Sequence, residues 1–206
     1  MPKHTFRFSK DFLERLKRAI RQAFVGVEPV RFGQEPNYTS AILSRLHGIK
    51  VQSDYGEYAK IQATNFDDRG PNSAEHRYGA DFAITATVSD PQKTIRKAIL
   101  VQVKGEPIDD LPPQEMDRLK KQIATMKQVV NSPKVAGIRK EERQAMLEIS
   151  SGNRVLDGET YSKTDFPEYF NQRVITTLDG TTNEEVVDAL QESDLKKLDL
   201  RIKKAG

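Results

Sequence analysis

Three polar side chains stand at the ends of two neighbouring apolar runs, and their types could support hydrolysis. Asp81 opens the run FAITATV, whereas Gln102 and Lys104 close the run AILVQVK. A carboxylate and an amide oxygen are hard ligands suited to Mg²⁺ or Mn²⁺, which bind few protein oxygens and retain waters. A nearby lysine can hold or deprotonate an attacking water and offset phosphate charge. The set favours phosphodiester hydrolysis, and the alternative is an exposed strand end whose polar residues happen to align.

The two apolar runs predict a pair of antiparallel strands. The first alternates in polarity, and AILVQV is apolar on both faces, as in a central strand covered on both sides. If SDPQKTIR connects the strands of a hairpin, paired residues have numbers that sum to about 185, so Asp81 lies opposite Lys104. Gln102 and Lys104 are two residues apart, and their side chains therefore leave the same face of the strand. We expect the three polar groups to converge at one end of the hairpin.

Hydrophobic periodicity predicts further helices and strands around this hairpin. Helical spacing of apolar residues, with Ser9 as the cap of the first helix, is found at 9–25, 35–48 and 112–130. Period-two alternation predicts strands within 48–54 and 57–66, and the turn formers of 67–75 predict a loop.

The last part of the chain is harder to interpret. Residues 141–149 fit a helix, 173–178 fit a short strand, and 184–200 fit a last helix with Thr182 and Glu185 as a capping box. The order of these elements predicts an α/β fold with a mixed central sheet and helices on both faces.

Length and composition bound the class of protein. A chain of 206 residues predicts one domain over 1–206, with a core at about 35–130 and additions at 9–25 and 173–204. The absence of cysteine excludes disulfides, thiolate metal sites and cysteine nucleophiles, and three scattered histidines do not form a zinc motif. No signal peptide and no membrane span is recognisable, so we expect a soluble, cytoplasmic protein.

Charged and aromatic residues outside the hairpin have two interpretations each. Each of three basic clusters fits the solvated face of a helix, and the three together favour a polyanionic partner. The first cluster is Arg15, Lys17, Arg18 and Arg21, the second is Lys120, Lys121 and Lys127, and the third is Lys196, Lys197, Arg201, Lys203 and Lys204. His76 fits a solvated loop residue or a phosphate contact. The aromatic residues of YSKTDFPEYF fit the packing of a long loop onto the sheet, or a DNA-stacking surface.

The run EHRYGADFAITATV followed by KAILVQVKGEP resembles the core of the PD-(D/E)XK, or restriction-endonuclease-like, nuclease superfamily. It is most similar to the variants in which Gln replaces the second acid. The resemblance implies that Asp81 is a metal ligand, that Gln102 faces the metal and that Lys104 serves the nucleophilic water. Because Gln102 supplies no negative charge, it departs from the more usual pattern of the family.

The family's extra acid has two candidates in this sequence. Glu35 stands at the start of the second predicted helix, and Glu75 stands six residues before Asp81. The resemblance thus gives Glu75, Asp81, Gln102 and Lys104 as catalytic candidates, and Glu35, Asp81 and Gln102 as metal candidates. For both glutamates the alternative is an ordinary surface residue.

The resemblance implies a restriction-endonuclease-like fold and a Mg²⁺- or Mn²⁺-dependent DNA nuclease acting in anti-phage defence, restriction or a mobile element. It leaves open a homodimer and a partner protein for targeting. The main alternative is an inactive nuclease-fold protein that serves as a DNA-binding or assembly module. A phosphate-handling enzyme on an unrelated α/β fold is a third, although no Gly-rich phosphate loop is present. DNA versus RNA, sequence specificity and endo- versus exonucleolytic cleavage stay open.

Overall fold

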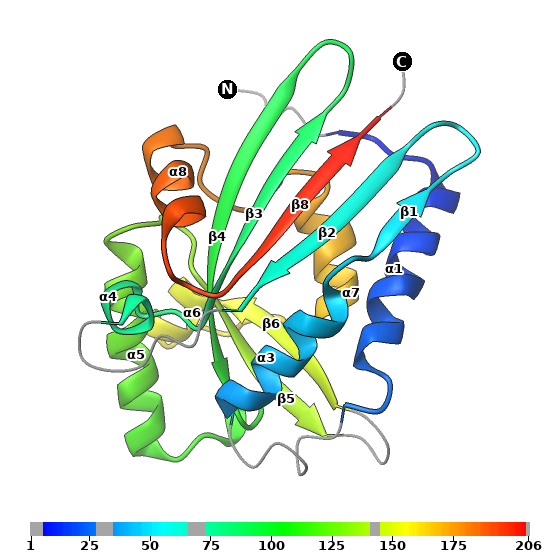
Figure 1. Ribbon diagram of the computed structural model, residues 1–206. Helices are drawn as coiled ribbons and strands as arrows, with labels where there is room; N and C mark the ends of the chain where they lie inside the picture. Colours follow the sequence, from blue (N-terminus) through cyan, green and yellow to red (C-terminus); the bar gives the residue numbers. More distant parts are fainter. Residues whose placement is uncertain (1–5, 28–34, 66–72, 141–144, 205–206) are drawn as a thin grey trace.

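Residues 6–27, 35–65, 73–140 and 145–204 are described by the computed structural model, with only the backbone of Glu35 and Pro36. These residues form an α/β fold around an open, eight-stranded mixed sheet (Figure 1). The strands are β1 (Lys50–Gln52), β2 (Tyr58–Thr64), β3 (Phe82–Ser89), β4 (Thr94–Lys104), β5 (Lys134–Lys140), β6 (Ala145–Ser151), β7 (Thr164–Asp165) and β8 (Lys197–Lys203).

The described helices are α1 (Lys10–Phe24), α3 (Glu35–Leu46), α4 (Ala74–Tyr78), α5 (Pro113–Lys127), α6 (Gly152–Asp157), α7 (Phe166–Tyr169) and α8 (Glu184–Glu192). A 3-10 turn, η1 (Ile108–Asp110), precedes α5, and a π-helical turn, η2 (Phe170–Val174), continues α7.

The strands follow the order β1-β2-β8-β3-β4-β5-β6-β7 across the sheet. Strand β3 pairs with β4 antiparallel and with β8 parallel, and β4 pairs with β5 parallel. The remaining pairs are antiparallel. The mixed central sheet predicted from the sequence is therefore confirmed.

Helices cover both faces of the sheet, as predicted, and each layer has its own apolar cluster. One cluster joins α1, α3 and α7 to the sheet and includes Phe12, Ile42 and Phe166. The other joins α4, α5, α6 and α8 to the opposite face and includes Leu119 and Leu190. The two groups of helices lie on different sides of the sheet in Figure 1. Alternate residues of β3 and β4 contribute to each cluster, because side chains of a strand point alternately to its two faces.

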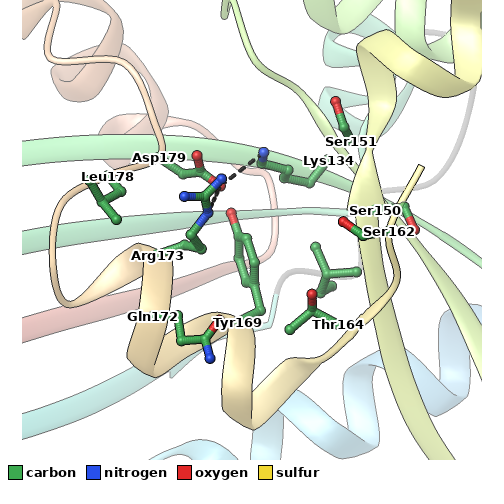
Figure 2. A pocket seen from close by; sticks show the side chains of 11 residues that line it. Lys134, Ser150, Ser151, Ser162, Thr164, Tyr169, Gln172, Arg173, Leu178 and Asp179 are labelled. Atoms are coloured by element: carbon green, nitrogen blue, oxygen red, sulfur yellow. Dashed lines mark ion pairs between the residues drawn. The ribbon is translucent and has the colours of Figure 1, made fainter. Parts of the chain in front are cut away.

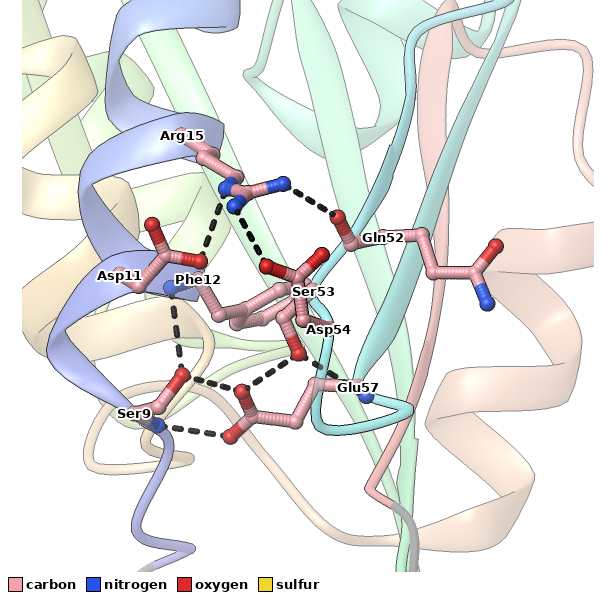
Figure 3. Close-up of polar contacts among 8 residues, drawn as sticks. All are labelled: Ser9, Asp11, Phe12, Arg15, Gln52, Ser53, Asp54 and Glu57. Carbon is pink, nitrogen blue, oxygen red and sulfur yellow. Dashed lines mark hydrogen bonds and ion pairs between the residues drawn. The ribbon is translucent and has the colours of Figure 1, made fainter.

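A buried carboxylate ties the start of α1 to the β1–β2 hairpin (Figure 3). Glu57, only 3% exposed, accepts hydrogen bonds from the Ser9 backbone N–H at 2.6 Å and from the hydroxyls of Ser9 and Ser53. The Ser9 hydroxyl also accepts the Phe12 N–H at 3.2 Å, which is the expected N-cap of the helix. Burial of this carboxylate is tolerated here because several donors surround it.

Several elements agree with the sequence predictions. The helices expected at 9–25, 35–48 and 112–130 are α1, α3 and α5, and the strands expected within 48–54 and 57–66 are β1 and β2. Tyr38, Ile42 and Leu46 are buried along α3, as their spacing predicts. The predicted hairpin is formed by β3 and β4. The aromatic residues Phe166, Tyr169 and Phe170 are buried, which supports the packing interpretation.

The later elements differ from their predictions. The helix expected at 141–149 is wrong where the structure describes it, because Ala145–Ser151 forms β6. The strand expected at 173–178 is wrong, since its first residues belong to η2 and Val174 and Ile175 pack in the core as part of a helical turn. Periodicity of short apolar runs does not separate these cases, and pairing with neighbouring strands decides them.

The predicted last helix, 184–200, divides into a helix and a strand. Helix α8 ends at Glu192, and β8 follows with Leu198, Leu200 and Ile202 buried at alternate positions. The helix cap is Asn183, which accepts the Glu185 and Val186 N–H groups, rather than the predicted pair of Thr182 and Glu185. The loop expected at 67–75 ends in helix α4, capped by Ser73.

None of the described helices is both long and apolar enough to cross a membrane.

Candidate active site

The β3–β4 hairpin brings Asp81 and Gln102 into direct contact. Phe82 pairs with Val101, and the Asp81 N–H donates to the Val101 carbonyl at 3.0 Å, so Asp81 lies beside Gln102. The Asp81 Oδ2 atom accepts the Val103 N–H at 2.6 Å and the Gln102 side-chain NH₂ at 2.5 Å. The predicted partner of Asp81, Lys104, is two positions further along β4. The convergence of Asp81 and Gln102 is observed, but the predicted register is wrong by two residues.

The turn of the hairpin explains the shifted register. Ser89 pairs with Thr94, which leaves residues 90–93 as the connection. The Asp90 carboxylate accepts the N–H groups of Gln92 and Lys93, both at 2.9 Å, and closes the turn earlier than the sequence suggested. These backbone hydrogen bonds, chiefly that from Gln92, hold the pKa of Asp90 below its usual value.

Gln102 and Lys104 share the face of β4 that packs against α5. Ala98 and Leu100, earlier on this face, belong to the same apolar cluster as Leu119 of α5. The polar pair continues that face to the end of the strand, and Gln102 is 2% and Lys104 4% exposed. The Lys104 Nζ atom lies 3.6 Å from a carboxylate oxygen of Glu115, in the first turn of α5. A lysine on the apolar side of a central strand is thus neutralised by one partly exposed acid.

Glu75 pairs with a lysine that the sequence did not connect with the site. Glu75 lies on α4, and its carboxylate accepts a hydrogen bond from the ammonium of Lys196, the residue before β8. The Lys196 carbonyl accepts the Ala83 N–H at 2.8 Å, which fixes this lysine beside the start of β3. The structure therefore places Glu75 at the same end of the sheet as Asp81, but as the partner of Lys196.

A glycine lets α4 approach α5 closely enough to hold this end of the sheet. Gly79 has a φ of 67° and ends α4 in the left-handed conformation. A Cβ atom at Gly79 would lie 2.6 Å from the Gln122 carbonyl oxygen of α5, so no larger residue fits without a backbone shift. Asp81 follows two residues later.

The charged groups at this end of the hairpin are largely paired with one another. Glu75 pairs with Lys196, and the Glu115 carboxylate lies 3.6 Å from the Lys104 ammonium and 3.8 Å from the Arg118 guanidinium. In the described part of the chain, no three His, Cys, Asp or Glu side chains come together as a metal-binding group.

The oxygens of Asp81 and Gln102 fit a hard cation that keeps several waters. Mg²⁺ is commonly held by one or two carboxylates and bound water, and an amide oxygen is an acceptable further ligand. In the structure the Gln102 NH₂ faces Asp81 and the Val103 carbonyl, at 2.5 and 3.0 Å. A half-turn of the amide about its last torsion would direct its oxygen toward a cation held by Asp81. The metal candidate Glu35 begins α3, but its side chain lies outside the described residues.

The basic clusters are only partly available to a polyanion. Lys196 and Lys197 are buried, and the Lys197 ammonium donates to the carbonyls of Gln191 and Ser193. The prediction of a solvated helix face for this last cluster is therefore wrong, because these residues lead into a central strand. On α1, Arg15 pairs with Asp11 at 2.8 Å. His76, by contrast, is exposed on α4.

Glu115 and Lys196 were not predicted as residues of this site. Glu115 had a recognisable signal, because it is an acid in the first turn of the helix that follows the Lys104 strand. Lys196 had none, because the helical interpretation of 184–200 placed it on a solvated face. Its position depends on the pairing of β8 with β3, residues more than a hundred positions apart.

Comparison with known proteins gives no match, either among family models, among curated protein sequences or among solved structures.

Proposed function

We propose that this α/β protein is a metal-dependent nuclease that hydrolyses DNA phosphodiester bonds. Its proposed active site consists of Asp81, Gln102 and Lys104. We further propose that its sheet corresponds to the restriction-endonuclease-like fold that the sequence resembles. The contact between Asp81 and Gln102, with Lys104 two residues further on the same face, supports this assignment.

The observation that carries the proposal is the burial of Lys104 and Gln102 at the end of an apolar strand face. Burial takes the Lys104 ammonium out of water, and Glu115, the acid 3.6 Å from it, has a side chain 45% exposed and is shared with Arg118. Buried polar groups in such a position at the end of a strand are candidates for chemistry.

Asp81 and Gln102 would hold Mg²⁺ or Mn²⁺ through a carboxylate and an amide oxygen. Such an ion would supply positive charge near the scissile phosphate and Lewis-acid activation of water. The ammonium of Lys104 would orient the attacking water or offset the charge of the phosphate from the same face of β4. Glu115, in contact with Lys104, would fix the position of its Nζ atom.

Basic residues of α4 and α5 would contact the DNA backbone around this site. Arg77 on α4 and Arg118, Lys121 and Lys127 on α5 are exposed. Both helices pack on the face of the sheet that carries Gln102 and Lys104. Such contacts with phosphates give affinity that depends on salt and carry no sequence information.

The test is nicking of supercoiled plasmid by the purified protein with Mg²⁺ or Mn²⁺, with a chelator as the negative control. We expect nicking that requires the metal and that is abolished in Asp81→Asn. The matched control is Asp117→Asn, an exposed acid on α5, which should nick as the wild type does. Nicking that persists in Asp81→Asn would place the chemistry elsewhere.

A second function, an inactive nuclease-fold module that binds DNA or assembles with a partner, is favoured by one observation. The Gln102 NH₂ donates a hydrogen bond to the Asp81 Oδ2 atom, so this oxygen has a partner without a cation. If this arrangement is permanent, the protein should bind DNA at low salt without nicking it, with either metal present.

A further inference from the structure

One side of the sheet is open to solvent over parts of β1, β2 and β8 in the described structure. Alternate residues of these strands, such as Ile61 and Leu200, belong to the apolar cluster that joins the sheet to α1, α3 and α7. The residues between them therefore point to the opposite side. There Lys50 and Arg201 are exposed and Lys60 is half buried. Helix α8, on the same side, packs on β3 and β4 (Figure 1).

Cations occupy directly opposite positions on this open side. Lys50 of β1 pairs with Lys60 of β2, and Lys60 pairs in turn with Arg201 of β8. The row continues through Thr87 of β3 to Arg96 of β4. Because neighbouring strands lie about 4.8 Å apart, the row spans roughly 19 Å across the sheet. Like charges directly opposite one another destabilise a pair of antiparallel strands, so this arrangement requires an explanation.

Most cations on this side have no counter-charge. Those without an ion pair in the described part of the chain are Lys50, Lys60, Arg201 and Lys203. Arg96, at the end of the row, pairs with Asp188 of α8 at 2.5 Å. Asp199, two residues before Arg201 on β8, accepts a hydrogen bond from the Thr85 hydroxyl. Unpaired like charges held in register by the sheet suit an anionic partner.

The cations of a polar pocket on the other side of the sheet are, by contrast, paired within the fold (Figure 2). Lys134 and Arg173 lie 2.9 and 3.7 Å from the same Asp179 carboxylate oxygen. Lys134 pairs beside Val101, whose side chain belongs to the cluster beneath α1, α3 and α7. Charge left for a partner is therefore found on the open side rather than in this pocket.

A second row of polar side chains runs beside the cations. Gln52 pairs with Tyr58, and Tyr58 pairs with Lys203. The row continues through Ser89 to Thr94, and neither row contains an acidic residue. Each member lies two residues from a member of the first row, so the two rows are about 7 Å apart. An aromatic ring stacks with any base, and hydroxyl and amide groups form hydrogen bonds with base edges.

We propose that this open side of the sheet binds single-stranded DNA, with phosphates along Lys50, Lys60 and Arg201 and a base stacked on Tyr58. A row of roughly 19 Å accommodates several phosphates of one strand. A duplex presents its bases only as edges in the grooves and leaves Tyr58 without a stacking partner.

The open side and the proposed active site lie on the same side of the sheet. Arg96 and Gln102 both belong to β4 and are six residues apart, a distance of about 20 Å along the strand. A strand bound on the open side is thus held on the side that carries Gln102 and Lys104. The choice of DNA rests on the proposed function, whereas the binding surface contains no residue of the proposed active site.

Fluorescence anisotropy with a labelled thymidine oligonucleotide of about 12 nucleotides tests the class of partner. The titrations contain a chelator, so that metal-dependent cleavage does not interfere. We expect the single strand to bind more tightly than a duplex of the same length, with an affinity that falls as salt is raised. The proposal is overturned if the single strand does not bind at low salt. It is also overturned if the duplex or a uridine oligoribonucleotide binds more tightly.

The double variant Lys60→Gln with Arg201→Gln tests the location of the surface. It removes two like charges that face each other, so its urea denaturation midpoint should equal or exceed that of the wild type. The slope of log affinity against log salt should decrease in magnitude by about 0.7 for each lost phosphate contact, or about 1.4 in total. The matched control is Arg18→Gln with Arg21→Gln, which removes two exposed cations of α1 on the opposite side. An unchanged slope in the first variant, or an equal change in the control, contradicts the proposal.

Tyr58→Leu tests the stacking of a base. Leucine keeps an apolar side chain on the strand but lacks the ring, so affinity for the thymidine oligonucleotide should fall about fivefold or more at an unchanged salt slope. Wild-type affinity would overturn the assignment of a single strand. Binding without nicking would retain this proposal and contradict the nuclease function. Nicking by a protein that does not bind the single strand would do the reverse.

Discussion

At the scale of single residues, Lys104 shows how burial and chemistry are connected. Its side chain ends the apolar face of a central strand, and Glu115 is the acid that it contacts at 3.6 Å. A lysine used only to bind phosphate would be expected at the surface, where its ammonium is hydrated. A buried lysine two residues from Gln102, on the same face of β4, suits the positioning of a water instead.

Lys104→Met should separate these roles, because methionine fills a similar volume without the charge. We expect folding and DNA binding to be retained, while single-turnover cleavage at saturating protein falls by about 10² to 10⁴, the usual range for a positioned acid–base group. The matched control is Lys120→Met, on α5, which should cleave normally at saturation. If the defect of Lys104→Met disappears when protein concentration is raised or salt is lowered, Lys104 is only a phosphate contact.

Glu75 has two interpretations at this scale, a third acid of the site or the partner of Lys196. Glu75→Gln removes the charge in both cases, and it leaves Lys196, 8% exposed, without its ion-pair partner. We expect the single variant to lose both stability and nicking. The double variant Glu75→Gln with Lys196→Met removes both charges, so stability should return.

The activity of the double variant decides between the two interpretations. If Glu75 is a third acid, the double variant stays inactive although it is stable. If nicking returns with stability, Glu75 acts only through Lys196. Glu35→Gln, tested in the same assay, examines the other candidate for the extra acid. Full activity in both single variants would mean that Asp81 and Gln102 hold the cation with water alone.

At the scale of elements, the attachment of α1 depends on one buried carboxylate. The Glu57 oxygens accept donors from Ser9 and Ser53, and they join the N-terminus of α1 to the turn between β1 and β2 (Figure 3). Apolar contacts of Phe12, Leu16 and Ile20 then hold the rest of the helix on the sheet.

Glu57→Gln keeps the shape of the side chain but replaces one acceptor by an NH₂ donor. That donor would face the Ser9 or Ser53 donors, so the hydrogen bonds at one oxygen are lost. We expect the free energy of unfolding to fall by about 1–3 kcal/mol in urea denaturation, the cost of buried polar groups left without partners. Asp54→Asn, which changes only an exposed ion pair with Arg15, should leave the denaturation midpoint unchanged. An equal midpoint for Glu57→Gln and wild type would contradict this role of the carboxylate.

Local sequence signals were sufficient for the elements whose contacts are local. The helix cap at Ser9 and the stripe of α3 agree with the structure because spacing and capping decide them. The hairpin was predicted, but its register was not, because the Asp90 hydrogen bonds that close the turn could not be anticipated from residue spacing. As a result, the predicted register placed Asp81 opposite Lys104, whereas in the structure Asp81 contacts Gln102.

At the scale of the whole molecule, the sheet depends on the last part of the chain. Strand β8 lies between β2 and β3, antiparallel to the first and parallel to the second. Its Asp199 carboxylate accepts the Thr85 hydroxyl of β3. The sequence interpretation missed this strand because a short apolar run next to a helix has no distinct period of its own. Such a strand is defined by partners far away in the sequence.

Removal of β8 should therefore disrupt more than the end of the chain. In the described sheet, β2 is joined to β3 by strand pairing only through β8, so a 1–192 fragment loses the hydrogen bonds that connect two parts of the sheet. We expect this fragment to lose cooperative unfolding and to show fast amide exchange in both β2 and β3.

The point variant Leu198→Ala tests the same dependence in the full chain, since Leu198 is fully buried. Its expected cost is about 2–5 kcal/mol, the usual range for a core leucine. Arg201→Ala, an exposed position of the same strand, should change stability little. Slow amide exchange throughout β3 in the 1–192 fragment would show instead that β3 to β7 form a sheet without β8.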